Sequence, residues 1–291
     1  MGKNMRWGEG FLLALLVALL VIPARAAWAD TVEVSTYEEL QTAVWGVKDS
    51  REIVVASDIE LESAVRVPRD TDIVLTDHGA GHTLSFAGGS GPVFSIPVGA
   101  SLALDVSVDA SKVTNRYQRE GLIAEVAGSL SIEGGTYSGA RVTSAYSGCF
   151  YVVGDQASMT INGGTISNNS CTNQDNGVVY VSGGASLLMT GGSIADNNAS
   201  ADVPRPNTAA VYLVGYDSEH KKTVDNASFT MTGGSITGNQ GYVGGRAGGQ
   251  LPSAGLRLHG ELYDERGNHL GQHGALHGRW GRSRHVRQLL L

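Results

Sequence analysis

The chain has 291 residues, of which 40 are glycine, and it carries a formal net charge of −7. The charge is unevenly spread: residues 30–245 hold 24 acidic and 11 basic residues, a net −13, whereas residues 246–291 carry a net +4. An acidic body argues against a nucleic-acid partner, because such partners select a basic surface.

Residues 1–29 have the layout of a secretory signal. After two basic residues, Phe11–Ile22 is an apolar run of 12 residues. Such a run is too short to span a bilayer comfortably and is typical of a signal h-region. Ala27-Trp28-Ala29 then fits the small-x-small cleavage rule. We therefore expect export and a mature chain beginning at Asp30, with an uncleaved anchor as the alternative; no other stretch predicts a membrane span.

Residues 30–99 predict a short amphipathic helix followed by irregular strands. Ser35 with Glu38 three residues later predicts a capping box, and Gly46 predicts the helix end. The apolar residues between them share one helical face: Tyr37, Leu40, Ala43 and Val44. Short strands are predicted at residues 53–56, 64–67, 73–75 and 83–86.

From residue 100 to 245 the chain repeats one sequence motif, called the phrase below. Its clearest copy is Ala157–Asn169, and further copies lie at 185–197 and 227–239. A looser copy lies at 128–140, and a degenerate one begins at Ala100. The Gly-Gly pairs within the phrase are 29, 28 and 42 residues apart. A period in this range marks a repeat architecture, in which each unit buries its apolar face against its neighbours.

The pattern inside the phrase favours strands. Met159 and Ile161 alternate with polar residues, which is typical of a half-buried strand. The Gly163–Gly164 pair permits a turn, and Ile166 is expected to point inward from a second strand. A third apolar run, such as Phe150–Val153, precedes each phrase. Asparagines after the second strand are expected to support tight turns and to form a ladder of side-chain hydrogen bonds between coils: Asn168, Asn169, Asn197 and Asn239.

Three short strands and three turns per unit predict an all-β fold, a right-handed parallel β-helix with coils about 4.8 Å apart. The helix in residues 30–99 would cap its first coil, because a solenoid must protect its apolar ends. A β-sandwich with Gly-rich turns is the alternative. The phrase resembles the repeats of right-handed β-helix proteins in the pectate-lyase-like superfamily, and most closely the Gly-Gly-Thr-Ile-x-x-Asn repeats of large bacterial surface proteins. The resemblance covers about Val32 to Gly245 and implies the fold more than the function, since this fold hosts lyases, hydrolases and adhesins.

Residues 246–291 do not continue the phrase and are rich in Arg and His. Translating Tyr263–Gly274 back to codons and shifting by one nucleotide permits Thr-Met-Asn-Gly-Gly-Thr-Ile-Ser-Gly-Asn-Thr-Ala. The Gly pair of this translation falls 33 positions after Gly233–Gly234, within the range of the other steps. We therefore expect a frameshift near Gly245 and an irregular C-terminal tail; a genuine basic tail is the competing hypothesis.

The two cysteines and a set of aspartates are candidate functional residues. Cys149 and Cys171 form an even pair in the part expected to be exported, which permits one disulfide, although spacing alone does not place their Cβ atoms. Enzymes of the resembled fold use Asp, Lys or Arg on an outer face, so the repeat-region carboxylates are weak catalytic candidates: Asp155, Asp175, Asp196 and Asp202. No two occupy the same place in consecutive coils, and Asp also suits solvated turns.

Three tyrosines are the candidate ligand-binding residues. Tyr151, Tyr180 and Tyr212 occupy the same place in three coils and are expected to stack in a column. Facing outward, such a column would be a platform for sugar rings or a protein partner; facing inward, it would be core. Valines flank each tyrosine and leave the direction open, with a slight preference for outward.

These patterns predict an exported or cell-surface structural repeat protein of adhesin type that binds carbohydrate or a host or cell-surface protein. A polysaccharide lyase or glycoside hydrolase is the alternative, and acids with Lys or Arg on one face of neighbouring coils would distinguish it from the first. We expect no cofactor and no metal site, because the repeat region has no nucleotide-binding motif and no Cys/His metal spacing.

The cleavage pattern makes one testable prediction. N-terminal sequencing of the exported protein should begin at Asp30, because the small residues Ala27 and Ala29 fit the signal-peptidase site. Retention of Met1 would show that the segment is an uncleaved anchor.

Overall fold

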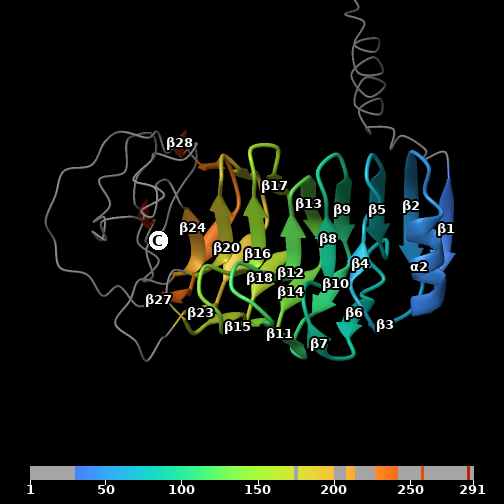
Figure 1. Ribbon diagram of the computed structural model, residues 1–291, viewed down its shortest axis with the longest axis horizontal. Helices are drawn as coiled ribbons and strands as arrows, with labels where there is room; N and C mark the ends of the chain where they lie inside the picture. The colour runs from blue at the N-terminus through green and yellow to red at the C-terminus, as the bar shows by residue number, and fades with distance from the viewer. Residues whose placement is uncertain are drawn as a thin grey trace, which may run out of the picture.

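The computed structural model describes residues 30–173, 176–199, 208–213 and 227–241, together with the backbone of residues 257–258 and 287–288. The described chain is a right-handed parallel β-helix, as the repeats predict. Figure 1 shows the coils stacked along the long axis, from β1 at the N-terminal end to β27 at the other. The expected signal segment lies outside the described residues.

Two long sheets run the length of the stack. Sheet 1 contains, in spatial order, β1 (Thr31–Val34), β2 (Ser50–Val55), β5 (Asp72–Thr76), β9 (Ser101–Asp105), β13 (Ser129–Gly134), β17 (Ser158–Ile161), β21 (Ser186–Met189), β25 (Ser228–Met231) and β28 (Arg257–Leu258). Sheet 2 contains β3 (Ile59–Leu61), β6 (Thr83–Phe86), β10 (Ser107–Asp109), β14 (Thr136–Ser138), β18 (Thr165–Ser167), β22 (Ser193–Ala195) and β26 (Ser235–Thr237).

The remaining strands form a third long sheet and two small ones. Sheet 3 contains β4 (Val65–Arg66), β8 (Phe94–Ile96), β12 (Gly121–Val126), β16 (Gly148–Val153), β20 (Gly177–Ser182), β24 (Thr208–Leu213) and β29 (Arg287–Gln288). Sheet 4 contains β15 (Arg141–Val142), β19 (Ser170–Cys171), β23 (Asn198–Ala199) and β27 (Gln240–Gly241), and β7 (Gly89–Ser90) pairs with β11 (Val113–Thr114). The coils of the repeat region therefore have a short fourth strand that the sequence did not predict.

Equivalent residues of successive coils lie in register. Met159 pairs with Leu130 of the preceding coil and Leu187 of the following one, and Leu187 pairs with Phe229. All four side chains are buried. The alternation seen in the phrase therefore produces a continuous apolar column inside the solenoid.

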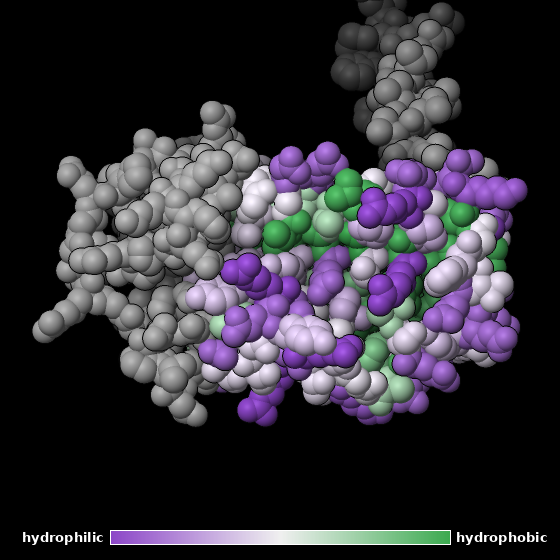
Figure 2. All heavy atoms as spheres, in the orientation of Figure 1, coloured by the Kyte–Doolittle hydropathy of each residue, from purple (hydrophilic) through white to green (hydrophobic). Residues whose placement is uncertain are grey.

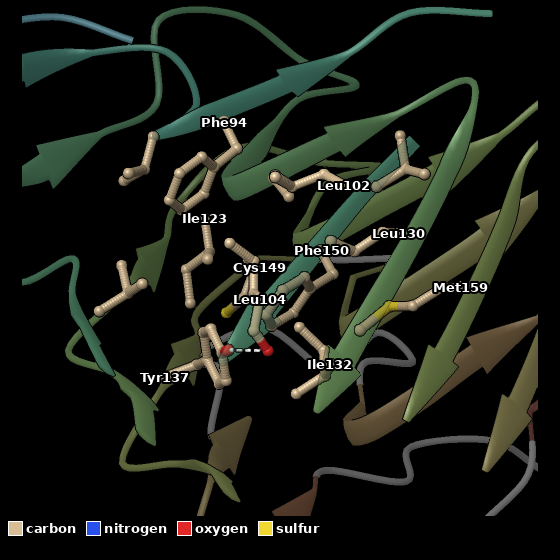
Figure 3. Close-up of a cluster of buried hydrophobic side chains, with 14 of the residues drawn as sticks. Phe94, Leu102, Leu104, Ile123, Leu130, Ile132, Tyr137, Cys149, Phe150 and Met159 are labelled. Carbon is tan, nitrogen blue, oxygen red and sulfur yellow. Dashed lines mark hydrogen bonds between the residues drawn. The ribbon is translucent and has the colours of Figure 1, made fainter. Parts of the chain in front are cut away.

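The interior is closely filled by side chains from three sheets. Figure 3 shows Phe94, Leu104 and Ile132 converging with Tyr137 and Phe150 in this core. The Tyr137 hydroxyl shares its one hydrogen between the carbonyl oxygens of Leu104 at 3.2 Å and of Gly134 at 2.9 Å. These bonds allow a phenol to lie in an apolar interior, because a buried hydroxyl without a partner would be destabilising.

The helix α2 (Tyr37–Trp45) covers the N-terminal end of the stack, next to β1 and β2 in Figure 1. Leu40, Ala43 and Val44 are buried against the core, which confirms the predicted apolar face. The predicted capping box was wrong by one residue. The N-cap is Thr36, whose hydroxyl accepts a hydrogen bond from the Glu39 backbone N–H. The sequence contains two overlapping Ser/Thr-x-x-Glu patterns, and only the backbone conformation selects between them.

The Gly-Gly pairs are required at every coil where they occur. The second glycine of each pair is left-handed, with φ of 76° at Gly135 and 69° at Gly164. The first has no space for a side chain: a Cβ on Gly163 would lie 2.1 Å from the Glu133 carbonyl oxygen, and one on Gly191 would lie 2.1 Å from the Asn162 carbonyl oxygen. The pair therefore combines close backbone approach with a turn that L-residues disfavour.

The predicted asparagine ladder is present and buried. Asn169 Nδ2 donates to Asn197 Oδ1 at 3.1 Å, and Asn197 Nδ2 donates to Asn239 Oδ1 at 2.9 Å. The backbone N–H groups of Asn169 and Asn197 donate to the same acceptors at 2.9 and 3.1 Å. Asn168 is not in the ladder; it is the left-handed turn residue before it, with φ of 54°. The asparagines thus divide two tasks that the sequence assigned to all of them.

Two short strands of residues 246–291 lie on the last coil. β28 continues sheet 1 in parallel beside β25, and β29 pairs antiparallel with β24. The other residues of this segment lie outside the described part of the chain. The frameshift therefore stays a prediction.

The ladder predicts a stability effect. Asn197→Ala should destabilise the protein by about 3 kcal/mol, because the Asn169 amide and the Ile166 carbonyl would lose buried partners. Urea denaturation followed by circular dichroism measures this. Asn168→Gly is the control: it keeps the left-handed turn and should change stability by less than about 1 kcal/mol. Equal effects of the two substitutions would contradict a special role for the ladder.

Candidate functional site

The three candidate tyrosines form a stack on sheet 3. Tyr151 pairs in register with Tyr180, and Tyr180 with Tyr212. Their ring centroids are 5.1 and 5.4 Å apart, with interplanar angles of 21° and 16°. On β16, Phe150 and Val152 point into the core, so the alternation of the strand places Tyr151 on the outer side of the sheet.

Only one end of this stack is accessible. Tyr180 and Tyr212 are 5% and 0% exposed, although neither belongs to the continuous apolar core, whereas Tyr151 is half-buried. The direction that the sequence left open is therefore outward from the sheet, yet the stack does not present three open rings. Tyr151 is therefore the solvent-accessible ring of the three, and Tyr180 stacks on it.

Two glycines make room for the stack. A Cβ on Gly148 would lie 2.9 Å from Tyr180 Cβ, and a Cβ on Gly177 would lie 2.5 Å from Tyr212 Cβ. Neither distance is compatible with a side chain unless the strands move apart. The Gly-x-x-Tyr spacing of β16 and β20 therefore places the tyrosine of one coil over the glycine of the coil before it.

The tyrosine stack belongs to a longer outward-facing column. Glu125 of β12 pairs with Tyr151, Ser95 of β8 pairs with Glu125, and Arg66 of β4 pairs with Ser95. Sequence reasoning missed these residues. The register shifts between Gly121 and Ala124, so β12 has one more residue between its glycine and Glu125 than β16 has between Gly148 and Tyr151. A search that allowed one extra residue would have aligned Glu125 with the tyrosines.

Burial shifts the pKa values of two groups of the column, Glu125 and Tyr151. Desolvation raises the pKa of Glu125, and the neighbouring Glu120 raises it further, while a hydrogen bond from the Gly121 backbone and the charge of Arg66 lower it. Desolvation also raises the pKa of Tyr151 to about 12, with Arg119 lowering it and Glu125 raising it. Partly buried groups with shifted pKa values and specific charged neighbours are typical of functional sites.

The turns that precede β12 and β16 border the column. Arg119 and Tyr146 are the equivalent residues of these turns, and both are left-handed, with φ of 65° and 58°. The Arg119 guanidinium lies 5.8 Å from the centre of the Tyr146 ring, a cation–π arrangement. Glycine or asparagine would occupy such a backbone position with less strain, so these long side chains are held there against a local conformational preference.

The backbone of these turns is fixed by buried polar groups. Glu120 is 8% exposed; its backbone N–H donates to Ser147 Oγ at 3.2 Å, and its carboxylate accepts from the Arg116 backbone N–H at 2.8 Å. Ser147 in turn donates its backbone N–H to Asn176 Oδ1 at 3.1 Å. We call Glu125, Tyr151, Arg119 and Tyr146 the outer patch. Its residues lie on two strands and on two turns that these hydrogen bonds hold.

Figure 2 shows mostly hydrophilic residues on the face in view, with hydrophobic ones gathered in its upper half. The outer patch itself is recognised from register, burial and charge.

The four candidate aspartates do not form this patch. Asp155 is exposed in the turn after β16, and Asp196 is exposed in the left-handed turn after β22, with φ of 52°. Asp175 and Asp202 lie outside the described residues. The two described aspartates thus occupy separate turns, as their different places in the repeat suggested.

The two cysteines lie inside the solenoid. Cys149 of β16 and Cys171 of β19 are both 0% exposed, and the Cys149 thiol is hydrogen-bonded to Cys171. Burial, followed by this contact, raises the pKa of the Cys149 thiol well above its usual value. Figure 3 shows the Cys149 sulfur among the core side chains.

Among the described residues, no group of three or more His, Cys, Asp or Glu side chains is arranged to hold a metal ion. In the same part of the chain, no helix has the length and apolar character needed to cross a membrane.

Comparisons of the chain with protein-family models, curated proteins and solved structures found no match.

The raised pKa of Glu125 predicts a pH-dependent effect. A carboxyl whose pKa is higher in the folded than in the unfolded state stabilises the fold when it is protonated, and this contribution is lost as pH rises through the folded pKa. Glu125→Gln should therefore raise the free energy of unfolding near pH 7, by less than about 1 kcal/mol because solvent screens this half-buried group. Below pH ~4, where the carboxyl is protonated in both states, the gain should disappear.

Urea denaturation at pH 4 and pH 7 measures this difference, with Glu62→Gln at an exposed site as the control. A gain for Glu125→Gln that is the same at both pH values would contradict the assigned cause.

Proposed function

We propose that this chain is an exported or cell-surface structural repeat protein of adhesin type, which presents the outer patch to carbohydrate. The observation that carries this proposal is the pair Arg119 and Tyr146, both left-handed and in cation–π contact, with the charge of Arg119 acting on Tyr151. Backbone strain of this kind is retained at binding sites, where side-chain placement matters more than local stability.

The chemistry of the outer patch suits a sugar. The partly exposed ring of Tyr151 offers an apolar surface to the face of a pyranose, and its stacking on Tyr180 fixes the ring orientation. Glu125 accepts hydrogen bonds from hydroxyl groups, and Arg119 donates them. An aromatic surface with a few placed polar groups is the usual composition of a small-ligand site.

The scaffold supports the same function. The asparagine ladder, the Gly-Gly turns and the apolar columns hold equivalent residues of successive coils in register. A site built on such elements keeps its geometry without help from a ligand. The stacked parallel coils and the repeated phrase also support a place among the pectate-lyase-like β-helix proteins and the repeat proteins of bacterial surfaces.

Export is the second part of the proposal. The apolar run Phe11–Ile22 and the Ala27-Trp28-Ala29 site support secretion or display on the cell surface. The net −13 of residues 30–245 supports a partner other than nucleic acid. A host or cell-surface protein is the other partner class compatible with the outer patch.

One observation favours an enzyme as the second candidate. Glu125, with its raised pKa, neighbours Glu120, and Arg66 and Arg119 carry positive charge to the same face. Acids with Lys or Arg on one face of neighbouring coils are the feature that would distinguish a polysaccharide lyase or hydrolase. A carboxyl with a raised pKa is also suited to act as a general acid.

Binding to a panel of immobilised glycans tests the first proposal. Tyr151→Ser should weaken binding about 10-fold, because one lost stacking contact is worth roughly 1 kcal/mol or slightly more. Tyr117→Ser is the matched control, since Tyr117 is exposed and lies outside the column. Glycan binding that both variants retain equally would remove the outer patch from the proposal.

The same preparations distinguish the second candidate. Incubation with soluble polysaccharides, followed by measurement of new reducing or unsaturated ends, should show no release. Release by the wild type that Glu125→Gln abolishes and Glu62→Gln retains would assign the chain to the enzymes.

A further inference from the structure

The contact between the two cysteines is not used by the outer patch. Cys149 is the second residue of β16, and Cys171 is the second residue of the short strand β19. Cys171 pairs in register with Val142, which precedes the turn leading into β16. The chain therefore travels through almost one coil between the two residues and returns to the same interior corner, where sheet 4 meets sheet 3.

The surroundings of the two sulfurs are apolar and closed. Both residues belong to the continuous core and are 0% exposed. The Cys149 thiol is hydrogen-bonded to Cys171, so its sulfur faces the other cysteine rather than solvent. Two thiols in mutual contact need only a small movement of their side chains to reach bonding distance.

We propose that Cys149 and Cys171 form an intramolecular disulfide within the solenoid interior, where Cys149 lies on the strand that also carries Tyr151. Oxidation joins the two sulfurs while each thiol loses one proton and one electron. The two electrons and two protons reduce the oxidant to two thiols. The oxidant is the disulfide of an exported thiol oxidoreductase or, in vitro, a small-molecule disulfide. The bond forms during folding, before the coil closes, because the buried thiols of the folded chain are inaccessible to such a partner and the thiolate needed for exchange is disfavoured there.

The position of the bond has a structural consequence. It closes a loop of about 20 residues that contains β16, β17 and β18, so it restricts the unfolded chain over most of one coil. It also ties the start of the strand that carries Tyr151 to the neighbouring sheet. A cross-link inside the core is protected from reductants in the folded protein, as both sulfurs lack exposure.

The full chain is prepared in two ways, by export from cells and by refolding in a glutathione redox buffer. Each preparation is quenched in acid and then unfolded in the presence of a thiol-alkylating reagent. Before reduction neither cysteine should be alkylated; after reduction both should be. Cleavage at methionine separates the cysteines at Met159, so the two fragments should stay linked until they are reduced. Alkylation of both cysteines without reduction in both preparations, or linkage only between separate chains, would overturn the proposal.

The two preparations separate this inference from export. A bond that forms in the redox buffer but not in the exported protein still supports the pairing and contradicts only the compartment. Protein that has been unfolded, reduced and refolded under reductant should have a Tm about 5–10 °C lower than the oxidised protein. The double variant Cys149→Ala, Cys171→Ala is the control, because reductant cannot act on it through this bond. An unchanged Tm of the wild type after reduction and refolding under reductant would show that the cross-link is absent.

Discussion

In-register stacking of each coil on its neighbours is the constraint on which the rest of this structure depends. Strands such as β17 make their ladder hydrogen bonds to the preceding and following coils, not within their own. At several positions the residue type is therefore explained by what lies one coil away. Gly163 is a glycine because the Glu133 carbonyl lies beneath it, and Asn197 is an asparagine because it joins the amides of the coils on both sides. Local propensity alone would require neither.

The same constraint explains how the outer patch arises. Register places one residue from each coil in a column, so a site along the solenoid axis is assembled from residues about one period apart in the sequence. Tyr151 pairs in register with Glu125 of the preceding coil and with Tyr180 of the following coil. Arg119 and Tyr146 meet because they occupy the same turn position in consecutive coils. A repeat scaffold can therefore build a binding surface by changing single residues while leaving the core pattern intact.

Burial, rather than the fold type, sets the chemistry of this face. Tyr137 and Tyr151 both have raised pKa values, but Tyr137 lies in the core and donates to backbone carbonyls, whereas Tyr151 lies outside with Glu125 and Arg119 nearby. Cys149 and Tyr151 are two residues apart on β16. Regular strand alternation would place their side chains on the same face. Cys149 nevertheless belongs to the buried core, whereas Tyr151 is half-buried and lies outside that core. One strand thus carries a residue of the buried cysteine pair and a residue of the outer patch.

The sequence by itself determined the β-helix, the capping helix, the inward residues of the repeated strands, the Asn ladder and the common place of the three tyrosines. Each follows from a short period or from a fixed position in the phrase, which local chemistry specifies. Only the tertiary structure decided the N-cap at Thr36, the fourth strand of the coil and the burial of Tyr180 and Tyr212. It also joined Glu125 to the column, because the extra residue in β12 hides that register in a linear alignment. The N-cap depends on the backbone conformation at Thr36, and the other features depend on contacts between coils; a sequence pattern specifies neither.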